Sequence, residues 1–145
     1  MREILFRGKS IKDEQWIFGN LLRTDYGVFV IQNYAPFEGM EKYEVEPKTV
    51  GQYTGLKDRN GIEIYEGDII TYQHDNDDCP FPNKDTKRRI GRVYFQEFRS
   101  CFAVAEGKGG SDRINQDLFR YVQNGNRVEA IGNIYDNPEL VGEQP

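Results

Sequence analysis

Histidine is almost missing from this 145-residue sequence, in which His74 is the only one. A single imidazole excludes a multi-histidine metal site and leaves no second histidine for a catalytic relay. Cysteine is nearly as scarce, because Cys79 and Cys101 form no Cys-x-x-Cys pair and are too few for a disulfide framework. We interpret both as free thiols, the usual state in a cytoplasmic protein.

Long hydrophobic runs and a net positive charge are also missing. No apolar stretch approaches the ~18 residues that a membrane span requires. The first apolar run, in residues 1–7, is too short and too charged for the apolar core of a signal peptide. We therefore expect a cytoplasmic protein that does not engage a membrane. The net charge of −5 disfavours non-specific nucleic-acid binding by the whole molecule.

Positive charge is nevertheless concentrated in one segment. Residues 84–99 hold six basic and two acidic side chains, and the basic ones include Lys87, Arg88, Arg89 and Arg92. A short charge run of this kind usually belongs to a solvated loop. The alternative is a basic patch that binds a partner, which makes these four residues the candidate partner-binding residues.

Aromatic residues and glycine are what the sequence does contain in quantity. Aromatic side chains make up 13% of the chain, and fifteen glycines indicate many turns. A chain of this length hides roughly two-thirds of its unfolded surface, so it can form a core without disulfides. We expect an N-terminal β section at 1–46 and a main domain at 47–145, although the composition does not change sharply between them.

Alternating apolar and polar residues predict short strands about ten residues apart, separated by turns rich in Gly and Asn. For 117–122 a strand and one helical turn both stay open, because the apolar residues there fit both periods. Trp16, Phe18 and, across Gly19, Leu21 or Leu22 are expected core residues. This pattern favours a β-sandwich or a barrel. The predicted strands are 2–7, 15–23, 27–34, 43–46, 50–56, 62–65, 69–72, 90–96, 101–105 and 128–135.

The best-specified local structure is the stretch 50–70, V-G-Q-Y-T-G-L-K-D-R-N-G-I-E-I-Y-E-G-D-I-I. Asn60-Gly61 predicts a type I′ hairpin turn, because both central residues of that turn need a positive φ. Gly67, between Glu66 and Asp68, predicts a bulge or a second reversal.

This stretch resembles the central motif of the YopX family, proteins of unknown function found largely in bacteriophages and prophages. R-E-I-L-F-R-G-K at 2–9 resembles the family's opening, and I-G-N-I-Y-D-N-P-E-L at 131–140 resembles its close. Only 73–88 resembles nothing, which indicates an insertion of variable length. The resemblance implies an all-β fold that ends in a small SH3-like barrel, and it transfers no catalytic or ligand residue.

The predicted long loop at 73–89 is the expected place for any site, because unstructured loops of this length are functional or disordered. His74, the aspartates after it and Cys79 could ligate a metal. Their spacing fits neither an EF-hand calcium loop nor a zinc site. We interpret the segment as a solvated acidic loop, with adventitious metal binding as the alternative.

No catalytic or cofactor motif stands out elsewhere. G-K-G-G-S at 107–111 lacks the order and the following helix of a phosphate-binding loop. Nucleophilic catalysis needs a positioned base beside Ser, Cys or Thr, and the one histidine lies in the long loop. We expect no cofactor.

The leading hypothesis is a non-catalytic phage or prophage accessory protein that binds another macromolecule, with an unknown protein as its partner. Self-association is part of this hypothesis, because strand edges in the N-terminal section invite pairing. The first alternative is a nucleic-acid-binding barrel that uses the basic segment 84–92 and tyrosines on one face. The second is an enzyme whose site the sequence does not reveal.

Overall fold

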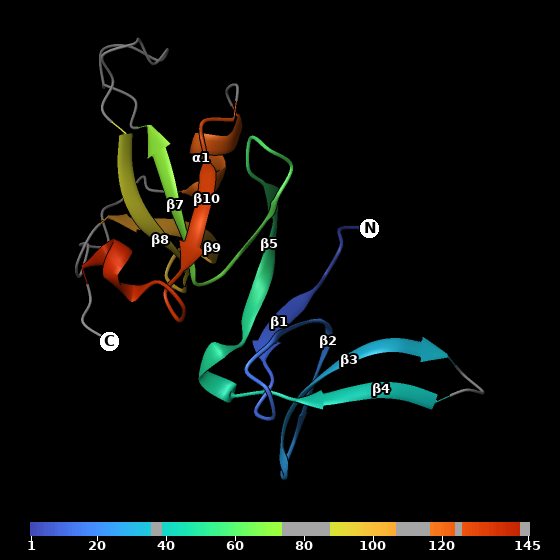
Figure 1. The fold of residues 1–145 in the computed structure, drawn as a ribbon. Helices are drawn as coiled ribbons and strands as arrows, with labels where there is room; N and C mark the ends of the chain where they lie inside the picture. Colours follow the sequence, from blue (N-terminus) through green and yellow to red (C-terminus); the bar gives the residue numbers. More distant parts are fainter. Residues whose placement is uncertain (36–38, 74–87, 107–116, 124–125, 143–145) are drawn as a thin grey trace. The chain divides into compact units, whose positions relative to one another are not determined.

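The computed structural model describes residues 1–35, 39–73, 88–106, 117–123 and 126–142 (Figure 1). The chain folds into two compact units, Met1–Gly55 and Leu56–Pro145. The division lies within a strand, later than the weak boundary at 46/47 that the sequence predicts. The separate roles expected for the two parts stay predictions.

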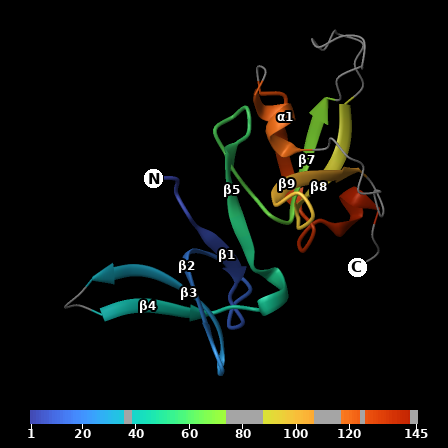
Figure 2. The ribbon, with the colours of Figure 1, turned by 180° about the vertical axis from the view of Figure 1, so that it is seen from behind.

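The first unit is an antiparallel sheet with the strand order β4-β3-β2-β1-β5. In both views β3 and β4 run side by side as a long hairpin (Figures 1 and 2). The last residues of β5 belong to the second unit, where this strand neighbours β6. The elements are β1 (Phe6–Lys9), β2 (Trp16–Thr24), β3 (Gly27–Ala35), β4 (Gly39–Glu44), the 3-10 helix η1 (Pro47–Thr49) and β5 (Gly51–Lys57).

Few side chains of this first unit are fully buried. Among its described side chains the buried hydrophobic ones are Val30, Val45 and Tyr53, whereas Phe18 is 44% exposed and Trp16 is half-buried. The prediction that Phe18 is a core residue is therefore wrong. Alternation assigned Phe18 to one side of a strand, but it could not show whether another layer of the protein covers that side.

The second unit contains the larger core. Its four-stranded antiparallel sheet has the order β10-β7-β8-β9, and α1 packs against β9. For 117–122, where the sequence left a strand and a helical turn open, the structure shows a helix. The elements are β6 (Glu63–Tyr65), β7 (Asp68–Gln73), β8 (Arg88–Gln96), β9 (Cys101–Glu106), α1 (Leu118–Gln123), β10 (Glu129–Asn133) and the 3-10 helix η2 (Pro138–Val141).

Period-two alternation supplies this core. Ile70 and Tyr72 project from β7 to the same side, where Val93 from β8 and Tyr121 from α1 meet them. The Tyr72 and Tyr121 rings lie 4.7 Å apart between centroids at an interplanar angle of 49°. The fully or nearly fully buried cluster is Ile64, Ile70, Tyr72, Val93, Val104, Leu118, Tyr121 and Val128.

The hairpin between β5 and β6 differs from its prediction. Gly61 has φ +81°, but Asn60 does not have a positive φ, so the predicted type I′ turn is wrong. Instead the Asp58 carbonyl accepts the Gly61 N–H, and the Asp58 N–H bonds to the Ile62 carbonyl. The Asp58 carboxylate also accepts the Asn60 and Ile62 N–H groups, at 2.8 and 2.9 Å. This side chain stabilises a longer turn in which only Gly61 is left-handed.

The all-β prediction is confirmed, with one short α-helix among ten described strands. Closure of the β10-β7-β8-β9 sheet into an SH3-like barrel stays a prediction. No helix among the described residues is long and apolar enough to cross a membrane. Most of the predicted long loop lies outside the described residues, as do His74, Cys79 and the glycine-rich segment 107–111.

Candidate partner-binding surfaces

The structure separates the basic residues that the sequence grouped together. Lys87 lies outside the described residues, whereas Arg88, Arg89 and Arg92 lie on β8. Side chains alternate along a strand, so Arg88 and Arg92 share one face and Arg89 lies on the other, where the core is. The described members of the predicted patch thus lie on two faces of β8, and their role in binding a partner stays a prediction.

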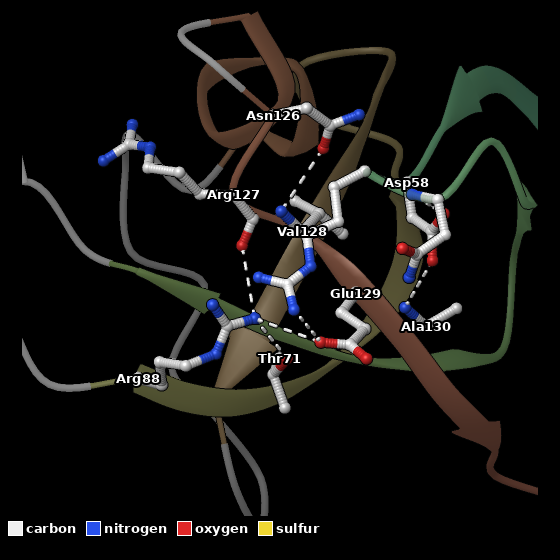
Figure 3. A network of polar contacts seen from close by, with 10 residues as sticks. Asp58, Thr71, Arg88, Asn126, Arg127, Val128, Glu129 and Ala130 are labelled. Atoms are coloured by element: carbon white, nitrogen blue, oxygen red, sulfur yellow. Dashed lines mark hydrogen bonds and ion pairs between the residues drawn. The ribbon is translucent and has the colours of Figure 1, made fainter.

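Arg88 is held by three neighbours (Figure 3). Its Nη2 donates to Thr71 Oγ1 at 2.6 Å and to the Arg127 carbonyl at 3.5 Å. The same atom lies 3.9 Å from Glu129 Oε2. Because Glu129 also pairs with Arg59 at 3.0 Å, two guanidinium groups share one carboxylate and leave a local surplus of positive charge.

Arg89 is neutralised by a direct ion pair. Its Nη1 lies 2.7 Å from Glu106 Oε2, and in the strand register it stands opposite Tyr72. Burial raises the pKa of the Tyr72 hydroxyl, and the nearby Glu106 carboxylate raises it further. The Tyr72 hydroxyl has no hydrogen-bond partner among the described residues. Arg89 is therefore partly exposed at the edge of the core, with its charge balanced by Glu106.

Arg92 is partly buried on the outer face of β8. Its Nε atom is buried and lacks a hydrogen-bond partner in the part of the chain that the structure describes. Ile90, 40% exposed, lies between Arg88 and Arg92 on the same face. This face thus combines an exposed apolar side chain with two guanidinium groups.

Asp58 connects the turn at 58–62 with β10 through hydrogen bonds of its side chain. One oxygen closes the turn at 58–62, and the other accepts the Ala130 N–H of β10 at 3.0 Å, 72 residues later in the sequence (Figure 3). The carboxylate is buried and fully occupied by backbone donors. This explains why Asp58 follows the strand in the recognisable motif, and it assigns the residue to folding rather than to chemistry.

Cys101 does not have the surroundings of a nucleophile. Its Sγ donates to Asp117 Oδ1 at 3.2 Å, and Asp117 in turn pairs with Arg99 at 3.0 Å. Burial, followed by the bond to Asp117, raises the pKa of the thiol. A raised pKa lowers the thiolate fraction, and the thiolate is the reactive form. Within the described ranges no three His, Cys, Asp or Glu side chains group as metal ligands.

The first unit carries a pocket that the sequence did not indicate. It has a volume of about 250 Å³ and is lined by Leu21 and Arg23 of β2, Val28 of β3, and Pro47 and Val50 at η1. Leu21 and Arg23 share a face with Val28 because Arg23 pairs with Val28 in the register and side chains alternate. Four of the five lining residues are apolar, and the fifth is a cation.

The wall formed by η1 is anchored to neighbouring strands. Thr49 is buried; its Oγ1 accepts the Lys9 N–H at 2.9 Å and donates to the Glu46 carbonyl at 2.7 Å. The Val45 N–H bonds to the Val28 carbonyl at 2.9 Å and so places the chain before Pro47 beside β3. The pocket is therefore largely pre-formed. The sequence shows the run Leu21-Leu22-Arg23 before the hairpin turn. It does not show that residues 47–50 pack against the face that carries Leu21 and Arg23.

Arg23 differs from the other cations of this sheet. Lys42 Nζ lies 4.7 Å from the centroid of the Phe29 ring, and Arg7 Cζ lies 4.6 Å from that of Trp16. Arg23 is exposed and makes no ion pair, hydrogen bond or ring contact with any described residue. Its guanidinium is thus available to an external anion.

Comparison with known proteins gives a fold and a family. The crystal structure of protein EF1440 from Enterococcus faecalis is similar, with a TM-score of 0.55 and 21% sequence identity. The similarity covers 97% of this chain and 99% of that one, and at this identity it shows the fold alone. None of the curated proteins matches. The YopX protein family model matches residues 5–142, nearly the whole sequence, so the chain belongs to the YopX family.

Proposed function

We propose that this YopX-family protein is a non-catalytic binding module of a phage or prophage, and that its N-terminal sheet contacts the partner. The observation that carries the proposal is the shallow core of that sheet. β2 and β3 each have nine residues, yet among the side chains of this unit that the structure describes the buried hydrophobic ones are Val30, Val45 and Tyr53. A sheet of this size gains most of its stability by burying a face against another layer. A bound macromolecule would supply that layer.

Self-association is one form of this function that the sheet supports. β4 ends the described strand order, most of its side chains are exposed, and Met40 on it is 50% exposed. An unpaired strand edge offers backbone N–H and C=O groups to a second chain. Light scattering after size exclusion, over a range of concentrations, tests this point. A monomer at every micromolar concentration contradicts self-association but leaves a different protein partner in place.

The main proposal is tested by mapping where a partner binds. The tagged full-length protein is used to capture partners from a bacterial host extract, and the purified complex is compared with the free protein by hydrogen–deuterium exchange. We expect slower exchange in 16–35 and 39–44 within the complex. Protection confined to 68–73 and 88–96 would contradict the proposal, as would recovery of no specific partner.

Nucleic-acid binding is the second candidate, because one observation favours it. Arg59, Arg88 and Arg92 supply three cations to a region in which Glu129 pairs with the first two, and Ile90 is exposed between the latter two. Against it stand the net charge of −5 and the ion pair that engages Arg89. Each phosphate contact changes the slope of log K against log salt by about 0.9 for duplex DNA.

The test measures binding of single- and double-stranded DNA and RNA as a function of salt. If the outer face of β8 binds phosphate, the double variant Arg88→Ala and Arg92→Ala weakens binding and flattens the salt dependence. Arg99→Ala, which removes a cation paired with Asp117 in the turn between β8 and β9, is the control. No binding of any of these nucleic acids at low salt removes this candidate.

A further inference from the structure

The pocket of the N-terminal sheet has the composition of a site for one apolar side chain beside a carboxylate. Leu21, Val28, Pro47 and Val50 line it, and Arg23 is the one charged residue among the lining residues. We propose that it binds an extended segment of a partner protein, which inserts a large apolar or aromatic side chain while an adjacent Asp or Glu pairs with Arg23. This inference deepens the proposed function and rests on it.

The volume limits the occupant. Small-molecule and cofactor sites usually occupy about 300 to 1,000 Å³, and this pocket has about 250 Å³. An engineered protein cavity of about 150 Å³ holds a benzene molecule, so the present pocket has room for an aromatic ring. Interfaces between proteins often place their strongest contacts in such pockets, where one aromatic or aliphatic anchor is fully desolvated.

The charge selects an anionic neighbour for that anchor. Arg23 has no partner among the described residues, and a guanidinium matches a carboxylate with two parallel hydrogen bonds. Beside an apolar wall such a pair is shielded from water on one side, which strengthens it relative to a fully exposed pair. A basic or purely apolar segment would leave the Arg23 charge unmatched.

The backbone next to the pocket favours an extended segment. β2 pairs with β1 over residues 16–19 and with β3 over residues 20–24, so along 20–24 the described pairing occupies one edge only. An extended peptide can add to such an edge through backbone hydrogen bonds and place alternate side chains in pockets. Leu21 and Arg23, two residues apart, lie on one face of this edge.

A random dodecapeptide library is the probe. It is selected on the immobilised full-length protein, and the enriched peptides are synthesised and measured by calorimetry. We expect enrichment of peptides with a Phe, Tyr, Trp, Leu or Ile beside an Asp or Glu. Arg23→Glu should weaken their binding at least about tenfold, since it places a carboxylate against the carboxylate of the peptide. Leu21→Ala should also weaken them, by removing part of the apolar wall.

Lys12→Glu is the matched control, because Lys12 is exposed in the same unit, away from the pocket lining, and the change alters the net charge equally. The affinity of the Lys12→Glu variant for the enriched peptides should stay within about twofold of that of the wild type. Circular dichroism of each variant checks folding, which Arg23→Glu should not disturb because that side chain is exposed and unpaired. Arg23→Lys keeps the charge but loses the two parallel hydrogen bonds, so its affinity should fall between those of the wild type and Arg23→Glu.

Four outcomes overturn the inference. The first is enrichment of peptides without the apolar–acidic pattern, and the second is binding of the enriched peptides to Arg23→Glu as tight as to the wild type. The third outcome is a wild-type oligomer that Arg23→Glu dissociates, which would make a second copy the occupant. A partner whose footprint lies on β2–β4 but whose binding survives Arg23→Glu supports the proposed function and refutes this assignment of the pocket.

Discussion

Asp58 shows how one side chain can determine both a local turn and a long-range contact. Its carboxylate accepts three backbone N–H groups, two from the turn and one from Ala130. Hydrogen bonds to a charged acceptor contribute about 1.5 to 3 kcal/mol each, and a buried donor without a partner costs a similar amount. The residue therefore stabilises the connection between β10 and the β5–β6 hairpin.

We expect Asp58→Asn to lower the free energy of unfolding by about 1 to 3 kcal/mol, because an amide NH2 would face the Ala130 N–H donor. Urea unfolding followed by far-UV circular dichroism measures the loss. Amide exchange at Ala130 should accelerate more than at Ile62. Asp25→Asn, at an exposed carboxylate in the β2–β3 turn, is the control and should change stability by less than about 0.5 kcal/mol. Equal effects of the two substitutions would show that the Ala130 bond contributes little.

Tyr72 presents the opposite case, a buried hydroxyl without a hydrogen-bond partner among the described residues. Burying such a group costs about 1 to 3 kcal/mol in proteins. We therefore expect Tyr72→Phe to leave stability at pH 7 unchanged or to raise it by about 1 kcal/mol. A loss larger than that in urea unfolding would indicate a hydrogen bond to a residue outside the described ranges.

The pH dependence of stability follows from the same residue. Burial raises the pKa of Tyr72 in the folded state, whereas an unfolded tyrosine titrates near about 10. Above that pH the unfolded chain loses the proton and the folded chain keeps it, so stability falls as pH rises, by up to about 1.4 kcal/mol per pH unit. Below it the contribution is fully present. Urea midpoints between pH 8 and pH 11 should fall less steeply in Tyr72→Phe than in the wild type.

At the scale of the element, β8 is shaped by one position without a side chain. A Cβ at Gly91 would lie 2.6 Å from Val104 Cγ1, 2.9 Å from the Ala105 carbonyl oxygen and 3.0 Å from Tyr72 Cε1. The strand therefore needs glycine there for space rather than for backbone conformation. Its neighbour Ile90 projects to the outer face and is 40% exposed.

Gly91→Ala should accordingly destabilise the second unit by about 1 to 3 kcal/mol, because the backbone and the Tyr72 ring must move to admit a methyl group. Far-UV circular dichroism in urea measures the effect. Ile90→Ala is the control on the same strand and should cost less, since the side chain is only partly buried. The expectation is refuted if Ile90→Ala proves the more damaging substitution.

At the scale of the whole molecule, the two units differ in how much they bury. The second unit contains an eight-residue core cluster, whereas three hydrophobic side chains are buried among those that the structure describes in Met1–Gly55. Stability in proteins follows the local density of buried apolar contacts. The first unit should therefore open more readily in the absence of a partner.

Trp16 is the only tryptophan and lies in the first unit, so its fluorescence reports on that unit alone. We expect its urea transition to occur at lower denaturant than the far-UV circular dichroism transition, which reports on both units. A partner that binds the N-terminal sheet should raise the urea concentration of the fluorescence transition towards that of the circular dichroism transition. Coincident transitions in the free protein would show that the two units unfold as one.

The sequence alone determined most of the strands, because period-two alternation and glycine-containing turns act locally. The strand predictions at 15–23, 27–34 and 101–105 match β2, β3 and β9 closely. The YopX resemblance, carried by the stretch 50–70, also identified the family that the comparison confirms. The strands depend on neighbouring residues in the chain, whereas the family rests on the resemblance of the motifs.

Only the tertiary structure decided which polar groups meet. Glu106 neutralises Arg89 and Glu129 meets Arg88 through strand pairing between distant segments, and the Ala130 contact of Asp58 spans 72 residues. Residues 47–50 likewise reach the face of β2 and β3 because Thr49 is bonded to Lys9. A hydrogen bond or a pocket depends on distances across the fold, and a sequence pattern contains no such distances.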